Sequence, residues 1–314
     1  EAIAHAILAH PRVDDRILEA FARSPHPTVR FGVAAHPKAT AEILLTLATD
    51  IDRDVREAVL ANAKADLEVL DALARDPDPQ LRIRVVKDPR TVEATLERMA
   101  RDSDAEVRLQ LARSKGATSS ILRILADDPD PRIQEHVALH PMTPPAGLVS
   151  LARRGTLQAR QDVLMHRNVV PSVLEALAGA PEPELRARLA THPALPAAVR
   201  ERLAHDADVN VLRAVARIPL LSPDALTRLA AHPDDEIRAL TSRHPATPAE
   251  ALERLAEDPV DGIRFGVLTH SYATPRACAK ALAHGFDLAA LRKLAETPTT
   301  SSAALALLAH QPDP

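Results

Sequence analysis

A chain of 314 residues with a net charge of −4 is too close to neutral for a globally basic nucleic-acid binder. Aromatic residues make up 2% of the chain and Trp is absent, so the composition favours helices over sheets, which prefer aromatic and β-branched residues. The single cysteine, Cys278, excludes an intrachain disulfide and a cysteine-based metal site, and it fits a cytoplasmic location.

A 26-residue period runs along the chain from about residue 3 to about residue 270. Three markers keep the same phase: an apolar residue followed by Arg, as in Val29-Arg30; the pattern Leu-x-x-Leu-Ala, as in residues 44–48; and the pair His-Pro, as in His36-Pro37. Such a period is typical of a helical-repeat protein, in which each unit stacks on its neighbours. We therefore predict an all-α solenoid of about twelve two-helix repeats.

Each repeat has room for two short helices, a first and a second, and 27 prolines supply the stops between them. Four pairs of a hydroxyl residue and Pro predict the start of a first helix, with the hydroxyl residue as the N-cap: those at Thr143, Ser222, Thr247 and Thr274. Thr247 with Glu250 also fits a capping box. The first helix of that repeat is predicted to stop near Asp258, and the second to run from about Asp261 to His270.

The chain is predicted to form one domain, residues 1–314, that is cut within a repeat at both ends. It opens on apolar residues of a second helix and closes on a first helix from Ala304 to Ala309, followed by Gln-Pro-Asp-Pro. Neither end shows the polar cap that solenoids usually need, so we expect a longer native protein or ends that pair with something. Near the end Leu282-Ala283 falls one place late, which predicts irregular last repeats.

The recurring blocks HPATPAEALERLAEDP and DRDVREAVLAN, which cover almost the whole chain, resemble the leucine-rich repeat variant family of bacteria. The resemblance implies a right-handed superhelix in which an α-helix alternates with a shorter α or 3₁₀ helix, with no β-sheet. HEAT-like repeats are the nearest related architecture. Some members of the family carry an iron–sulfur domain with clustered cysteines, which nothing in this chain matches, so no cofactor is expected. The resemblance leaves function open.

The recurring arginines form an arginine ladder, whose members could bind either inside the array or to anions. In the first interpretation each guanidinium reaches an Asp or a carbonyl in the turn between the helices of its own or the next repeat; Asp residues recur six positions before it, as at Asp50 and Asp76. We expect this structural role, because a residue present in nearly every repeat usually holds the repeats together. The ladder comprises Arg30, Arg56, Arg82, Arg108, Arg186, Arg238 and Arg264, with Arg160 in the same register.

The recurring histidines and Cys278 are expected to be structural. Each histidine, such as His140 or His244, lies at the end of a second helix, where it can cap the helix. Helices pack about 8–10 Å apart, so histidines of neighbouring repeats cannot share one metal ion, and no metal is expected. Cys278 is expected to be a small buried residue; a nucleophile would need a base, and only His284 is near in sequence.

The positions one, two and five residues after the ladder arginine are predicted to face outward and to vary between repeats. They include two groups of cations, which we predict to bind a partner: Arg84, Lys87 and Arg113; and Arg188, Arg213, Arg217 and Arg243. The alternative is an ordinary surface with local ion pairs, such as Glu184 with Arg188.

These features predict a non-catalytic scaffold that binds a partner protein or peptide, with acidic partners among the candidates, on the face lined by the second helices. No phosphate loop, nucleophile elbow or zinc-protease motif is present, so an enzyme is not expected. Nucleic-acid binding by a basic concave face is the alternative, although stacking aromatics are few. No apolar run approaches the ~20 residues of a membrane span, so no membrane partner is expected.

Overall fold

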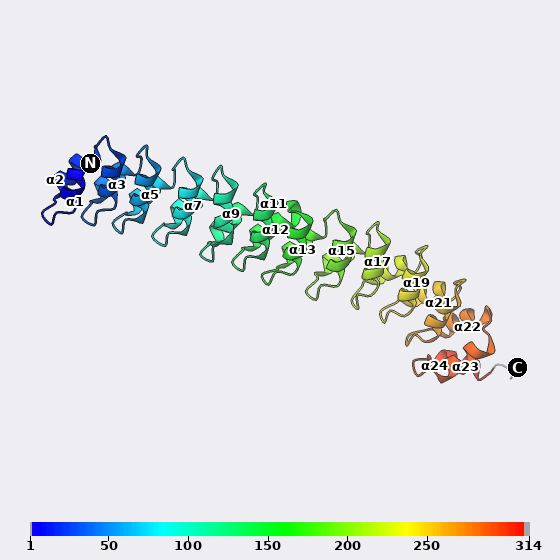
Figure 1. Cartoon of the computed structure of the whole chain (residues 1–314). Helices are drawn as coiled ribbons and strands as arrows, with labels where there is room; N and C mark the ends of the chain where they lie inside the picture. Colours follow the sequence, from blue (N-terminus) through cyan, green and yellow to red (C-terminus); the bar gives the residue numbers. More distant parts are fainter. Residues whose placement is uncertain (1, 311–314) are drawn as a thin grey trace. The chain divides into compact units, whose positions relative to one another are not determined.

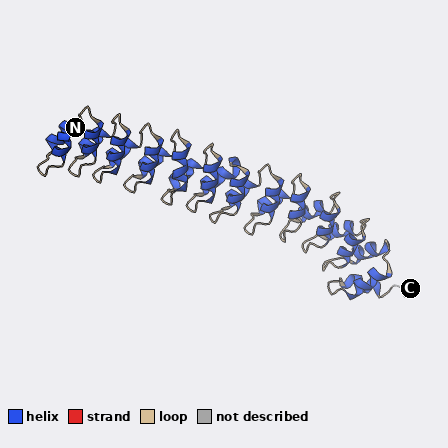
Figure 2. Ribbon diagram, viewed as in Figure 1, coloured by secondary structure: helices blue, strands red, loops and turns tan. Residues whose placement is uncertain are grey.

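The computed structural model describes residues 2–310, and these residues form helices and connecting turns without a strand (Figure 2). Two compact units follow one another along the chain, Glu1–Asn168 and Val169–Pro314, and each is described by itself. Within each unit the fold is the predicted all-α helical-repeat solenoid (Figure 1). The prediction that residues 1–314 make one domain stays a prediction, and the closing Gln-Pro-Asp-Pro lies outside the described residues.

The first unit alternates first and second helices in the 26-residue phase. Its first helices are α2 (Asp15–Ala22), α4 (Ala41–Leu47), α6 (Leu67–Leu73), α8 (Glu93–Met99), α10 (Ser119–Leu125) and α12 (Pro145–Arg154). Its second helices are α1 (Ala2–Leu8), α3 (Pro27–Ala34), α5 (Arg53–Ala61), α7 (Pro79–Lys87), α9 (Ala105–Arg113), α11 (Pro131–Leu139) and α13 (Leu157–Leu164).

The second unit continues the same alternation. Its first helices are α14 (Pro171–Leu177), α16 (Ala197–Leu203), α18 (Pro223–Leu229), α20 (Ala249–Leu255), α22 (Pro275–Ala283) and α24 (Ser302–Leu308). Its second helices are α15 (Pro183–Ala190), α17 (Val209–Val215), α19 (Asp235–Ser242), α21 (Asp261–Leu268) and α23 (Leu288–Glu296). The lengthened α22 precedes a turn in which Gly285 has a φ of 78°, so the predicted irregularity near the end is confirmed.

The core of each repeat lies between its two helices and the helices of the next repeat. In α4 and α5 the buried apolar side chains include Ile43, Leu44 and Leu47 from the first helix and Val55 and Val59 from the second. Helices of seven to nine residues are too short to be stable alone in water, so this shared burial holds them in place. The recurring Leu and Val of the sequence are thus the contacts that stack one repeat on the next.

The predicted helix starts are right at two of the four hydroxyl–proline pairs. The hydroxyls of Ser222 and Thr274 accept hydrogen bonds from the third amide beyond them, as N-caps of α18 and α22. At Thr143 and Thr247 the prediction is wrong, because the following proline occupies the N-cap position and the helix begins one residue later. Both threonine hydroxyls are buried and donate instead to the carbonyl six residues earlier, at the end of the preceding second helix, so the Thr247–Glu250 capping box does not form.

Candidate functional site

The ladder arginines bind inside the array. Arg56 donates from Nε and Nη2 to the two carboxylate oxygens of Asp76, at 2.6 and 3.1 Å, and from Nη1 to the carbonyl of Asp50 at 2.8 Å. Asp76 lies in the turn of the next repeat, and its carboxylate also accepts the amide of Asp78. Each such pair therefore fastens two neighbouring repeats and the turn between two helices. The same bidentate pairs join Arg30 to Asp50, Arg82 to Asp102, Arg108 to Asp128, Arg186 to Asp206 and Arg238 to Asp258.

The ladder changes wherever the aspartate twenty residues further on is absent. In one repeat the ladder position is Gln134, and the residue twenty further on is Arg154. The side-chain amide of Gln134 donates to the carbonyl of Asp128, and its oxygen accepts the amide of Thr156. In another repeat the ladder position is Leu212, and the residue twenty further on is His232. At these two places Arg and Asp are replaced together. Arg160 is retained although Ala180 occupies its partner position, and it donates to the carbonyls of Ala152 and Arg153.

Arg264 is a ladder arginine without its aspartate, because His284 occupies the partner position. It donates to the carbonyl of Asp258 and to the carboxylate of Asp261, and its guanidinium lies 5.3 Å from the ring centre of Phe286. Its Nε is buried without a hydrogen-bond partner. The irregular turn after α22 thus leaves this last arginine incompletely satisfied.

The Arg186–Asp206 pair makes stability depend on pH in a defined direction. Hydrogen bonds from Arg186, partly opposed by burial, lower the pKa of Asp206 below its ordinary value of 3.8. A carboxylate whose pKa is depressed in the folded state stabilises the fold above its unfolded pKa, and that contribution is lost as the pH falls.

We therefore expect Asp206→Asn to destabilise the chain at pH 7 and to matter progressively less below about pH 4. Urea unfolding of both proteins between pH 7 and pH 2.5 measures this. A difference between the two midpoints that stays constant across the whole range would contradict the assignment.

The recurring histidines follow the second helices and join neighbouring repeats. His270 accepts the amide of Tyr272 at Nδ1 and approaches the carbonyl of His244 with Nε2 at 2.8 Å. His140, His166 and His244 make the same two contacts with residues two ahead and 26 behind. Asn62 takes this role in its repeat, since its amide donates to the carbonyls of Ala34 and His36. These contacts give the histidines a structural use, as predicted.

Neither a metal site nor a reactive thiol is built from the described residues. No group of three or more His, Cys, Asp and Glu side chains within residues 2–310 is arranged to hold a metal ion. Cys278 is fully buried, as predicted, with its Sγ 3.4 Å from the hydroxyl of Ser301. Burial raises the pKa of Cys278, so the thiol stays protonated at neutral pH. None of the helices in residues 2–310 has the length and apolar character to cross a bilayer.

The outward face of the second helices is only partly as predicted. The residue five after each ladder position is exposed in most repeats, including Lys87, Arg113, Arg217 and Arg243. The residue one after it varies: Phe31 is 46% exposed, whereas Ile83 and Leu109 are 8% and 1% exposed. At Ile83 and Leu109 the prediction of an outward side chain is therefore wrong.

In the first unit the predicted cations lie together at the ends of α7 and α9. Lys87 and Arg113 line one hollow of about 460 Å³ between these helices. Arg84 pairs with Glu57, whereas Lys87 has no carboxylate within ion-pair distance in the described chain. Arg113 donates to His136 Nε2 at 3.0 Å, and burial together with the charge of Arg113 lowers the pKa of His136. An imidazole carries no negative charge in either protonation state, so the charge of Arg113 remains uncompensated.

In the second unit two of the four predicted cations are bound within the chain. Arg213 pairs with Asp234 at 2.6 Å, and Arg217 pairs with Glu236 at 2.8 Å. Arg188 and Arg243 are exposed and have no ion pair with any described residue; the expected Glu184–Arg188 pair does not form. Arg243 borders a hollow of about 320 Å³ beside Gly266 and Tyr272. Of the four predicted cations of this unit, Arg188 and Arg243 are thus free of ion pairs with described residues.

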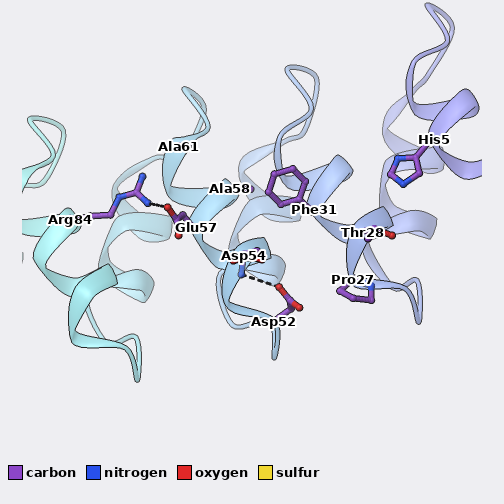
Figure 3. Close-up of a pocket in the computed structure, with 10 residues that line it drawn as sticks. All are labelled: His5, Pro27, Thr28, Phe31, Asp52, Asp54, Glu57, Ala58, Ala61 and Arg84. Carbon is purple, nitrogen blue, oxygen red and sulfur yellow. Dashed lines mark hydrogen bonds and ion pairs between the residues drawn. The ribbon is translucent and has the colours of Figure 1, made fainter. Parts of the chain in front are cut away.

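A further hollow, which the sequence analysis missed, lies on the second helices α3, α5 and α7 (Figure 3). It has a volume of about 650 Å³, and its walls include the exposed ring of Phe31, the carboxylates of Asp54 and Glu57, and the small side chain of Ala61. Arg84 closes one edge through its pair with Glu57, as the dashed line in Figure 3 shows. The signal in the sequence was an exposed aromatic beside alanines at outward positions.

No protein-family model matches the chain, and no curated protein matches it. Among solved structures, one similar chain is an engineered protein with 15% identity, matched over 93% of this chain and 94% of its own, at a TM-score of 0.12. Another is a computationally designed armadillo repeat protein for modular peptide recognition, with 16% identity over 92% of this chain and 97% of its own, at a TM-score of 0.13. Scores this low carry no argument, and the helical-repeat assignment stands on the structure itself.

Proposed function

We propose that the chain is a non-catalytic scaffold that binds a partner protein or peptide on the face lined by the second helices. One observation carries the proposal: the repeated arginines, aspartates and histidines are bound inside the array, whereas the exposed ends of the second helices differ from repeat to repeat. An array of short, interlocked helices with a varied outer row suits recognition of an extended surface. Membership of the leucine-rich repeat variant family and a cytoplasmic, bacterial setting belong to the same proposal.

The free cations of this face are its strongest candidates for contact with a partner. They are Lys87 and Arg113 in the first unit and Arg188 and Arg243 in the second. No carboxylate of the described chain neutralises these charges. Arg84, Arg213 and Arg217 contribute less, since each is already paired. An acidic partner fits the free charges.

Charge reversal tests the proposal with a matched control. The full chain serves as bait in a lysate of its host, half of it treated with nuclease, beside the variants Lys87→Glu/Arg113→Glu and Arg188→Glu/Arg243→Glu. The control, Arg123→Glu/Arg254→Glu, reverses two exposed cations on the first helices α10 and α20.

We expect one protein to be captured equally from both halves by the native chain and the control, and at least one reversed variant to weaken its binding by about tenfold or more. Capture that no reversal on the second helices affects would refute the choice of face. Capture lost on nuclease treatment would show that nucleic acid is the ligand, and a steep dependence on salt would accompany it.

A further inference from the structure

The second helices of the first unit present chemically distinct sections in a fixed order. The residues five after the ladder positions are Ala35 and then, in the five repeats that follow, Ala61, Lys87, Arg113, Leu139 and Met165, and all are exposed. We call the last five of these residues the outer row. Its order is small, basic, basic, apolar, apolar, and each section has surroundings that specify what it can bind.

The section at Ala61 suits a cationic side chain. Its methyl side chain leaves room for the hollow of about 650 Å³, where Phe31 is 46% exposed and Asp54 has no ion pair within the described chain. A cation placed there would face both a carboxylate and an aromatic ring. Arg84 does not fill this role, because its guanidinium is held at the edge by Glu57 (Figure 3).

The section at Lys87 and Arg113 suits two acidic side chains. Both cations line the same hollow, and the nearest aspartate, Asp88, is bound bidentately by Arg90. The neighbour of Arg113 is the imidazole of His136, which supplies no negative charge. Two positive charges one repeat apart are therefore available to carboxylates.

The section at Leu139 and Met165 suits apolar side chains. Leu139 is 62% exposed and Met165 is 67% exposed, and Met142, in the turn after α11, is 53% exposed. Large apolar side chains gathered at neighbouring positions mark a surface that is covered by something. Methionine is a flexible residue that adapts its shape to a bound side chain.

The spacing of the outer row matches an extended peptide. Packed helices lie about 8–10 Å apart, and a peptide in the extended polyproline II conformation advances about 3.1 Å per residue with three residues per turn. Three peptide residues therefore correspond to one repeat, and every third side chain faces the same side. We propose that the first unit binds an extended peptide with one basic, two acidic and two apolar side chains, in that order, each about three residues from the next. This inference rests on the proposed scaffold function and specifies its partner. A nucleic acid would leave both the carboxylate of Asp54 and the apolar section unmatched.

Two synthetic peptides test the order directly. They carry the pattern Arg-x-x-Glu-x-x-Glu-x-x-Leu-x-x-Leu and its reverse, with Ser, Thr and Gly at x, because either chain direction satisfies the spacing. Fluorescence anisotropy with the full chain measures binding. We expect one direction to bind with a Kd of about 1–100 µM, and a scrambled peptide of the same composition to bind at least about tenfold more weakly.

A charge exchange then locates the peptide. The variant Lys87→Glu/Arg113→Glu should lose at least about tenfold in affinity, and a peptide with Lys at both Glu positions should restore it to within about threefold. The control Arg123→Glu should bind like the native chain. Equal binding of the scrambled peptide, no effect of the exchange, or no binding in either direction would overturn the inference. If the peptides fail but capture of a host protein still depends on the same cations, the scaffold function stands and only the peptide order is refuted. If no capture depends on these cations, both proposals are refuted.

Discussion

Asp76→Ala is expected to destabilise the chain by about 3–5 kcal/mol, because it leaves the buried guanidinium of Arg56 without its counter-charge. Asp76 is 4% exposed and Arg56 is 7% exposed, and their two hydrogen bonds are among the most enclosed of the ladder. The substitution also removes the acceptor for the amide of Asp78, which starts α7. Loss of one ladder pair thus weakens the interface between two repeats as well as the turn inside one of them.

Urea unfolding followed by circular dichroism measures this effect, since guanidinium salts would screen the charges under study. Glu57→Ala is the matched control: it removes a carboxylate from the same α5, but its pair with Arg84 is exposed, so the expected loss is within about 1 kcal/mol. Combining Asp76→Ala with Arg56→Met should recover part of the loss by removing the stranded charge. Similar losses for Asp76→Ala and Glu57→Ala would show that the ladder contributes little.

The positions of the helices could be predicted from the sequence because the apolar residues of each helix recur with the 26-residue period. Apolar residues three and four apart, such as Leu252 and Leu255, recur in one phase, and both are buried in the structure. The helix starts could be predicted only in part. At Thr143 and Thr247 the hydroxyl lies one place before the N-cap position and donates to a buried carbonyl of the preceding helix. The spacing of Thr and Pro in the sequence does not show that this hydrogen bond forms in place of the cap.

The partners of the ladder required the three-dimensional arrangement. The sequence shows an aspartate six residues before most ladder arginines, but each arginine binds the carboxylate twenty residues after it, in the next repeat. Because the chain is periodic, the aspartate twenty residues after one ladder arginine lies six residues before the next. Only the stacking of the repeats shows which of the two arginines its carboxylate binds. Asp128 and Asp206 were overlooked for this reason, since Gln134 and Leu212, not Arg, follow six residues later.

The candidate site could be predicted in part. The exposed cations lie on the second helices as expected, but which of them are free depends on contacts with other repeats, such as Arg213 with Asp234. The hollow beside Phe31 was missed because its signal, an aromatic residue beside alanines at outward positions, includes no charged or reactive group.

The pairing rule of the ladder predicts that a missing pair can be built. Leu212 and His232 occupy the positions of Arg and Asp, and His232 already accepts the amide of Asp234 at Nδ1, as a ladder aspartate accepts the amide two residues on. We expect Leu212→Arg alone to cost about 3–5 kcal/mol, since it places a charge at a site that is 7% exposed without a counter-charge. Adding His232→Asp should recover most of that loss.

A double-mutant cycle in urea measures the coupling directly. The two substitutions together should be less destabilising than the sum of the single ones by at least about 2 kcal/mol, because only the double variant forms the bidentate pair. Leu212→Arg with Asp234→Asn is the control: it retains His232, so no carboxylate is supplied at the ladder position. Additive losses in the cycle would mean that the ladder pairs reflect the local turn and not a contact that fastens repeats. Strong coupling would show that an Arg–Asp pair stabilises the interface between two repeats. The residues of the outer row take no part in these pairs.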